Sequence, residues 1–186
     1  MSKTQYYTAS SIDGFIADPD NSLQWLFESD SGRPESTRYP EFYAQVGAMA
    51  MGSTTYEWLL EHEDMRVDPS RWQASFGDVP SWVFSSRDLP VLDGARVEFV
   101  RGDVAPVHAA MAAAAASRNI WLIGGGDLVG QFADAGLLDE LIIGYAPVTL
   151  GAGAPLLPRR MLSSRLRLQS VEQEAQFAYV TYTVHP

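Results

Sequence analysis

The chain has 186 residues, of which 46% are hydrophobic and 11% aromatic, so it can bury one good core and forms most simply a single domain over residues 1–186. The absence of cysteine excludes disulfides, zinc–thiolate sites and thiol catalysis. A formal net charge of −10 argues against a surface that binds nucleic acid, and no apolar run reaches the roughly 18 residues of a membrane span. The amino-terminal residues lack the pattern of a secretion signal. We therefore expect a cytoplasmic protein without nucleic-acid or membrane partners.

Strand-like and helix-like patterns alternate along the chain. In chain order they predict strand 5–9, strand 14–17, strand 48–52, helix 53–60, strand 81–85, strand 95–100, helix 104–117, strand 120–123, helix 127–135 and strand 140–145. Two alternating segments, 165–172 and 177–185, predict a C-terminal antiparallel hairpin. The polar, proline-containing segments 28–39 and 61–80 are predicted to be loops. The whole pattern predicts an α/β sheet covered on both faces and made mixed by the hairpin.

The stretch "NIWLIGGGDLVGQF", Asn119 to Phe132, places three glycines between a predicted strand and a predicted helix. In α/β sheets, ligands bind beyond the carboxyl ends of strands, where the start of a helix offers unpaired N–H groups and partial positive charge. Glycines let a phosphate group approach those amides without interference from a Cβ atom. The other interpretation is a tight turn that requires positive φ angles. Three glycines in a row at such a junction favour a ligand site.

Four segments carry a more specific pattern: "TASSIDGFIADPDNSLQW", "AMAMGSTTYEWL", "SWVFSSRD" and "IWLIGGGDLVGQFADAGLLDELIIGYAPVTLGAGAPLLP". In this order they resemble the dihydrofolate reductase fold, and within it the branch related to the reductase domain of the bifunctional riboflavin-biosynthesis deaminase/reductase. The resemblance implies a three-layer α/β/α domain with a mixed, mostly parallel sheet. It also implies binding of a reduced nicotinamide dinucleotide, whose hydride passes to a pterin or to a ribosylamino-pyrimidine.

Carried over position by position, the resemblance assigns a set of cofactor-binding residues. Ala9 and Ile16 would flank the nicotinamide; Gly52, Ser53, Thr54 and Thr55 would meet the pyrophosphate; Ser85, Ser86 and Arg87 would meet the adenosine; and Gly124, Gly125, Gly126, Asp127, Leu128 and Val129 would hold the diphosphate from the opposite wall. The resemblance further implies a cis peptide bond between Gly124 and Gly125, and a homodimer.

The chain also departs from the family pattern. Ser53 stands where many relatives have arginine and Asp127 where some have it, so fewer cations are available for a phosphate. The Ala-Asp-Asp-Pro type segment of the riboflavin reductases is also absent. The absence of that segment argues against a riboflavin-pathway enzyme. Arg87 remains as a cation beside the expected adenosine ribose, so NADPH is the predicted cofactor, with NADH possible.

No acid for proton transfer aligns securely. Asp13 either faces the substrate or forms a turn with the following glycine, and Trp25 either roofs the substrate pocket or anchors the core. Three further carboxylates, Asp30, Glu35 and Glu41, follow Trp25 as candidates. The three histidines, His62, His108 and His185, are far apart without a carboxylate at metal-ligand spacing, so no metal site is expected.

The predicted function is therefore an NADPH-dependent reductase that acts on a small heterocyclic or imine-containing molecule. The alternative is a ligand-binding protein that keeps the cofactor groove without turnover, and the third hypothesis is a structural subunit that binds no ligand.

Overall fold

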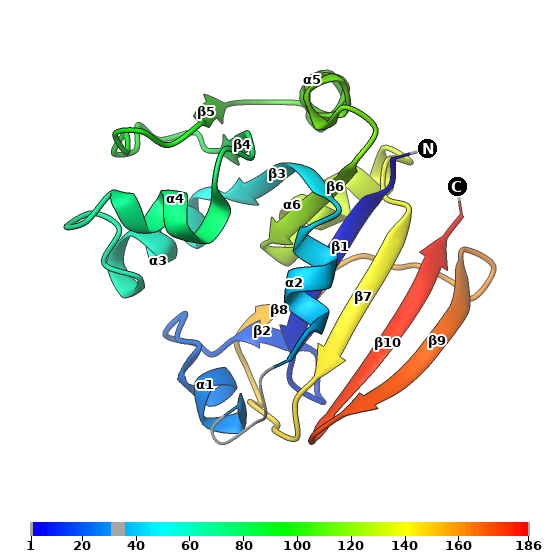
Figure 1. Cartoon of the computed structure of the whole chain (residues 1–186). Coiled ribbons are helices and arrows are strands. Elements are labelled where there is room, and N and C mark those ends of the chain that lie inside the picture. Colours follow the sequence, from blue (N-terminus) through cyan, green and yellow to red (C-terminus); the bar gives the residue numbers. More distant parts are fainter. Residues whose placement is uncertain (1, 31–35, 186) are drawn as a thin grey trace.

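The computed structural model describes residues 2–30 and 36–185. It contains a large mixed sheet with helices on both faces, which gives three layers (Figure 1). This architecture confirms the α/β/α fold that the sequence predicts.

Among the described residues, the strands form two sheets. The large sheet has the order β5 (Val97–Val100), β4 (Ser81–Phe84), β3 (Val46–Gly52), β6 (Asn119–Gly124), β1 (Thr4–Ser10), β7 (Glu140–Tyr145), β10 (Phe177–Val184) and β9 (Leu166–Glu174). From β5 to β7 the neighbouring strands run parallel, whereas β10 and β9 form the antiparallel hairpin. A small sheet pairs β2 (Phe15–Ala17) with β8 (Ala154–Pro155). The predicted C-terminal hairpin is therefore confirmed.

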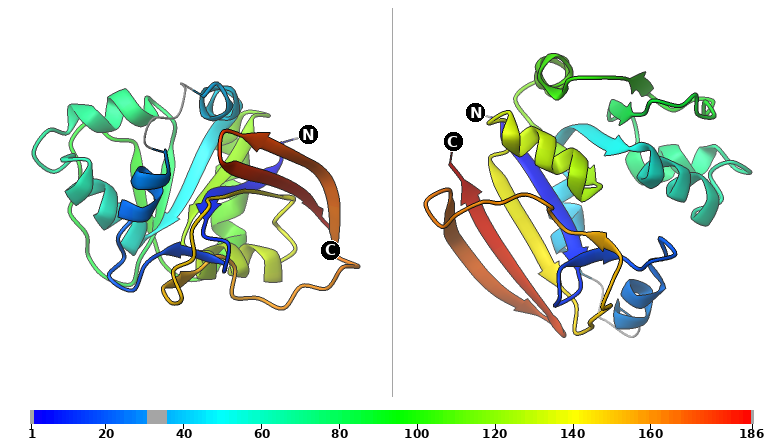
Figure 2. Two further views of the ribbon diagram at one scale, coloured as in Figure 1. Left: turned by 90° about the horizontal axis from the view of Figure 1, so that it is seen from below. Right: turned by 180° about the vertical axis from the view of Figure 1, so that it is seen from behind.

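Helices cover both faces of the large sheet. They are α1 (Gln24–Asp30), α2 (Arg38–Tyr43), α3 (Ser53–His62), α4 (Ser70–Phe76), α5 (Val104–Ala115) and α6 (Gly126–Asp134). On one face, α2, α3 and α4 pack over a core that includes Met49, Tyr56 and Trp72. On the other face, α5 and α6 pack over Leu122, and Phe132 of α6 belongs to the same core (Figure 2, right). Because β3 and β6 are covered on both faces, they are nearly continuous apolar runs.

The prediction of loops is wrong for parts of both polar segments. Helix α4 lies inside 61–80, and α1 and α2 extend into 28–39. Trp72 and Phe76 are four residues apart and buried, so they attach α4 to the core despite its polar neighbours. Pro40 lies in the first turn of α2, where a missing N–H costs no intrahelical hydrogen bond.

The connections after β3 and β6 create the site. Gly52 ends β3 directly before α3, and Gly124 ends β6 just before α6. Gly124 has φ +138°, a conformation that favours glycine. The peptide bond between Gly124 and Gly125 is cis, as the resemblance implies. Both helices therefore begin at the carboxyl edge of the sheet, where ligands of α/β proteins bind.

Within the described ranges, no helix is long and apolar enough to cross a membrane. The same residues contain no cluster of three or more His, Asp or Glu side chains placed to hold a metal ion.

Candidate functional site

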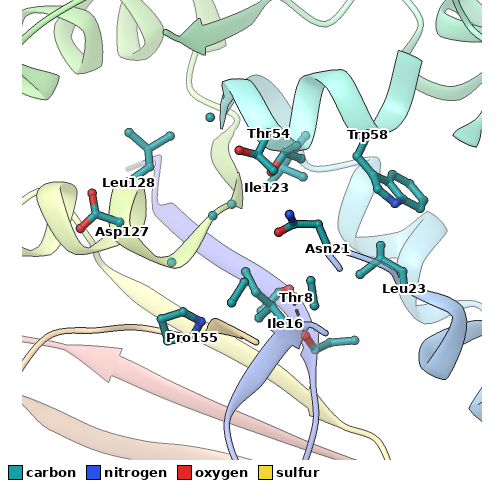
Figure 3. Close-up of a pocket in the computed structure, with 18 of the residues that line it drawn as sticks. Thr8, Ile16, Asn21, Leu23, Thr54, Trp58, Ile123, Asp127, Leu128 and Pro155 are labelled. Carbon is teal, nitrogen blue, oxygen red and sulfur yellow. Dashed lines mark hydrogen bonds between the residues drawn. The ribbon is translucent and has the colours of Figure 1, made fainter. Parts of the chain in front are cut away.

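A cavity of about 760 Å³ lies at the carboxyl ends of β1, β3 and β6. Figure 3 shows Asp127, Leu128 and Pro155 on one side of it and Trp58 and Leu23 on the opposite side. Most of the predicted cofactor residues line it: Ala9, Ile16, Gly52, Ser53, Thr54, Thr55, Gly124, Gly125, Gly126, Asp127 and Leu128. Residues from four separate parts of the chain thus meet in one cavity.

One end of the cavity is formed by two helix starts. The residues before α3 and α6 are Gly52 and Gly125, both extended and both without a side-chain cap. A Cβ atom added to Gly52 would lie 3.8 Å from the backbone nitrogen of Gly125, so the two helix starts are close together. First-turn N–H groups have no partner within their own helix and carry partial positive charge. This end of the cavity therefore suits an anion such as a diphosphate.

The three consecutive glycines have three different roles in the backbone. Gly124 adopts a positive φ. A Cβ atom on Gly125 would meet no protein atom within 4 Å, so this residue faces open space. A Cβ atom on Gly126 would collide with the Pro155 carbonyl oxygen and lie 2.8 Å from the Leu156 carbonyl carbon. The turn and ligand interpretations of the triplet are thus compatible, because one glycine serves the turn, one borders the cavity and one packs against the chain.

The other end of the cavity is aromatic. Its lining includes Tyr7, Phe27, Trp58 and Tyr179 from β1, α1, α3 and β10. The rings of Phe27 and Trp58 stack with centroids 6.2 Å apart. Burial raises the pKa of the Tyr7 phenol far above its ordinary value, so Tyr7 stays protonated at neutral pH. Sequence alone does not predict this end, because its side chains come from separate elements and aromatic residues are usually core residues.

Four of the predicted cofactor residues do not line the cavity. Val129 lies on α6 and is fully buried in the core that α5 and α6 form with the sheet. The Ser85 hydroxyl accepts a hydrogen bond from the Arg87 backbone N–H at 3.0 Å and donates one to the Arg87 carbonyl at 2.8 Å, so it closes a turn. Ser86 is exposed. The Arg87 guanidinium pairs with Glu57 on α3 at 2.6 Å, and not with the neighbouring Asp88.

Asp13 lies outside the cavity and holds a loop. Its carboxylate accepts hydrogen bonds from the Ser11 hydroxyl at 2.6 Å and from the backbone N–H groups of Leu150 and Gly151 at 3.0 and 2.7 Å. The Ser11 hydrogen bond is the largest cause of its lowered pKa. The turn interpretation of Asp13 therefore agrees with the structure.

Trp25 and the other candidate acids do not line the cavity either, so far as they are described. Trp25 is 8% exposed and packs with Phe177 and Tyr179 as a core residue. Glu41 lines a second cavity, of about 510 Å³, beside α2. Asp30 is the last residue of α1, and its side chain lies outside the described part of the structure, as does the whole of Glu35.

Comparison with solved structures places the fold. A putative riboflavin biosynthesis protein from Shewanella sp. PV-4 superposes with a TM-score of 0.78 at 25% identity, covering 99% of both chains. The deaminase/reductase from Thermotoga maritima gives 0.65 at 14% identity, covering 98% of this chain and 56% of that one. Dihydrofolate reductase from Enterococcus faecalis, complexed with NADP(H), gives 0.57 at 14% identity, covering 98% and 95%. The protein therefore has the dihydrofolate-reductase-like fold.

Sequence comparison gives the family. The model of the RibD C-terminal domain matches residues 62–177. The uncharacterized protein YwjB from Bacillus subtilis is 32% identical over 97% of both chains. The chain belongs to the RibD C-terminal domain family, as its sequence motifs indicate.

Proposed function

We propose that this protein is a reductase that binds a nicotinamide dinucleotide, preferably NADPH, and transfers its hydride to a small planar heterocycle or imine. The observation that carries the proposal is a single cavity that joins two uncapped helix starts to an aromatic end. A dinucleotide has the same division, with an anionic diphosphate and a flat nicotinamide ring.

The residues present fit such a cofactor. The first turns of α3 and α6 would hold the diphosphate through backbone N–H groups, and the hydroxyls of Thr54 and Thr55 lie in the same wall. Ala9 and Ile16 would contact the nicotinamide between this end and the aromatic end. The cofactor supplies the hydride, while the chain positions both reactants and excludes water. The NADP(H) complex of the structurally similar dihydrofolate reductase supports this choice of cofactor.

The aromatic end would receive the substrate. Planar side chains such as Trp58 and Phe27 favour a flat, largely apolar ring. The hydroxyls of Tyr7 and Tyr179 offer hydrogen bonds to polar atoms of that ring. A pterin-like or pyrimidine-like heterocycle has both properties.

The test is a pair of glycine variants measured against the wild type by calorimetric titration with NADPH. Gly125→Val places a branched side chain in open space at the expected diphosphate site, so the variant should fold normally and lose at least about tenfold in affinity. Because Gly125 has φ −74°, the substitution imposes no positive-φ strain. Normal folding together with unchanged NADPH affinity would refute the site.

One observation favours the alternative of a binding protein without turnover. Asp127 is the only carboxylate among the described residues that line the cavity, and it lies at the helix-start end. A substrate at the aromatic end that needs a carboxylic acid for protonation would therefore find none among the described residues that line that end. Oxidation of NADPH measured against pterins, pyrimidines and quinoid compounds distinguishes the two functions, since a binding protein gives tight cofactor binding and no oxidation with any of them.

A further inference from the structure

Arg159 lies along α6 and joins its two ends. Its Nη1 is 3.0 Å from Asp127 Oδ1 in the first turn, and its Nε is 2.7 Å from Asp134 Oδ2 in the last residue. The two carboxylates are seven residues apart, so they share one face of the helix. Gln131, between them, donates a hydrogen bond to Asp127 Oδ2 at 3.0 Å. The arginine is thus held in one place by a side chain at each end.

Gly130 makes room for this arrangement. A Cβ atom at Gly130 would lie 2.8 Å from the Nε and Cζ atoms of Arg159, so the guanidinium rests on the bare helix backbone. The side chain of Arg159 is only 25% exposed, and its Nη1 also donates to the Pro158 carbonyl at 2.9 Å. Pro158 and Asp127 line the cavity, whereas Arg159 contacts both of them and does not line it.

Asp127 poses an electrostatic problem for an anionic ligand. It lies in the helix turn whose N–H groups face the expected diphosphate, and its side chain is 69% exposed. Hydrogen bonds from Gln131 and then from Arg159 lower the pKa of Asp127, so it is charged at neutral pH. A carboxylate at this position repels a phosphate and reduces the positive potential at the start of the helix, unless a cation cancels its charge.

We propose that Arg159 is the residue that cancels the charge of Asp127 and so allows the dinucleotide diphosphate to bind at α6. The inference rests on the proposed function and extends it, because it assigns a role in cofactor binding to a residue outside the cavity lining. Arg159 acts through Asp127 and not by touching the ligand, which makes it a positioning residue of the cofactor site. The diphosphate is common to NADPH and NADH, so both cofactors depend on it equally.

The experiment is a double-mutant cycle. Titrations of NADPH and NADH are compared for the wild type, Arg159→Ala, Asp127→Asn and the double variant at low ionic strength. Arg159→Ala should weaken the binding of both cofactors by about tenfold, whereas Asp127→Asn should bind them at least as tightly as the wild type. The affinity of the double variant should lie within about twofold of that of Asp127→Asn. The loss in Arg159→Ala should shrink at about 0.5 M salt, which a packing defect would not do.

Two further variants sharpen the result. Gly130→Ala forces the guanidinium away from the helix and should weaken both cofactors as Arg159→Ala does, but only while Asp127 is present. Arg160→Ala removes the adjacent, exposed arginine and should leave binding unchanged.

The outcomes separate the two proposals. If the wild type binds neither dinucleotide, the proposed function is wrong, and this inference falls with it. If the wild type binds and Arg159→Ala is unchanged, or the double variant stays as weak as Arg159→Ala, only the role of Arg159 is overturned.

Discussion

Arg87 and Glu57 illustrate how one contact changes the expectation for cofactor choice. Both nitrogens of the Arg87 fork contact Glu57, at 3.1 and 2.6 Å, and Nη2 also donates to the Ser53 hydroxyl at 3.3 Å. Ser53 lines the cavity, so Arg87 lies at its border. We expect the guanidinium to reach a ribose phosphate bound beside Ser53, with Glu57 as a competing partner.

We predict that Arg87→Ala weakens the binding of NADPH by about tenfold, the low end for the loss of a charge-assisted hydrogen bond. The affinity for NADH should be nearly unchanged. The modest figure follows because Arg87 must leave Glu57 to meet the phosphate. Glu57→Gln removes the competing charge and should strengthen NADPH while leaving NADH unaffected. Titrations of both cofactors check this, and equal losses for both in Arg87→Ala would mean that Arg87 supports the fold and does not bind the phosphate.

His108 gives a prediction for pH. Its Nε2 lies 2.8 Å from Thr4 Oγ1, and burial lowers its pKa while Asp139 partly opposes that shift. The pKa of His108 in the folded state therefore lies below its value of 6.5 in the unfolded chain. The contribution of neutral His108 to the free energy of unfolding is present above pH 6.5 and is lost as the pH falls through the pKa of the folded state.

The wild type should therefore lose more free energy of unfolding than His108→Gln between pH 7 and pH 5. Urea unfolding at a series of pH values measures the difference. His62→Gln, which changes an exposed histidine, is the control and should follow the wild type. Parallel pH curves for the wild type and His108→Gln would contradict the prediction.

At the scale of elements, the start of α6 depends on two neighbouring glycines in opposite ways. Gly125 borders open space, whereas Gly126 touches the chain at Pro155 and Leu156. We predict that Gly126→Ala destabilises the protein by about 1–3 kcal/mol, the usual cost of overpacking, because α6 must move away from β8. Gly125→Ala, its matched control, should unfold at the wild-type denaturant concentration. Chemical denaturation tests the pair, and equal midpoints for the two variants would contradict the assigned packing.

The elements also show how much of the fold follows from the sequence. The strands β3, β6 and β7 and the helices α3, α5 and α6 are predicted because apolar runs and 3.6-residue periodicity identify them directly. Helices α1, α2 and α4 have six or seven residues, too few for a clear period, and are held by tertiary contacts such as those of Trp72.

The site divides in the same manner. The end formed by the two helix starts is predictable, because glycines between a predicted strand and a predicted helix can be recognised in the local sequence pattern. Its aromatic end and the ion pairs of Arg87 and Arg159 depend on residues brought together over 25 positions or more. Local pattern carries no information on such pairs, which is why Arg159 is not distinguished from a surface arginine by sequence alone.

At the scale of the whole molecule, the sheet is covered unevenly. In the described part of the chain, no helix lies over β9, which forms one edge of the large sheet (Figures 1 and 2). Its residues Leu168 and Val171 share the face of the sheet that α6 covers farther along, since they pair with Tyr182 and Val180. They are 53% and 64% exposed. An exposed apolar edge strand is prone to pair with another chain.

We therefore expect β9 to form the interface of a homodimer, with Leu168 and Val171 on the buried side. Light scattering of the wild type should give twice the 20.4 kDa mass of the chain. The double variant Leu168→Asp/Val171→Asp should give the single-chain mass, because the interface would bury two carboxylates that have no cation beside them. Val91→Asp changes an exposed residue (76%) in the loop after β4 and should remain dimeric. The β9 variant should still bind NADPH, since neither changed residue lines the cavity. A wild-type mass of 20.4 kDa at high protein concentration would exclude the dimer and leave the apolar face of β9 without an explanation.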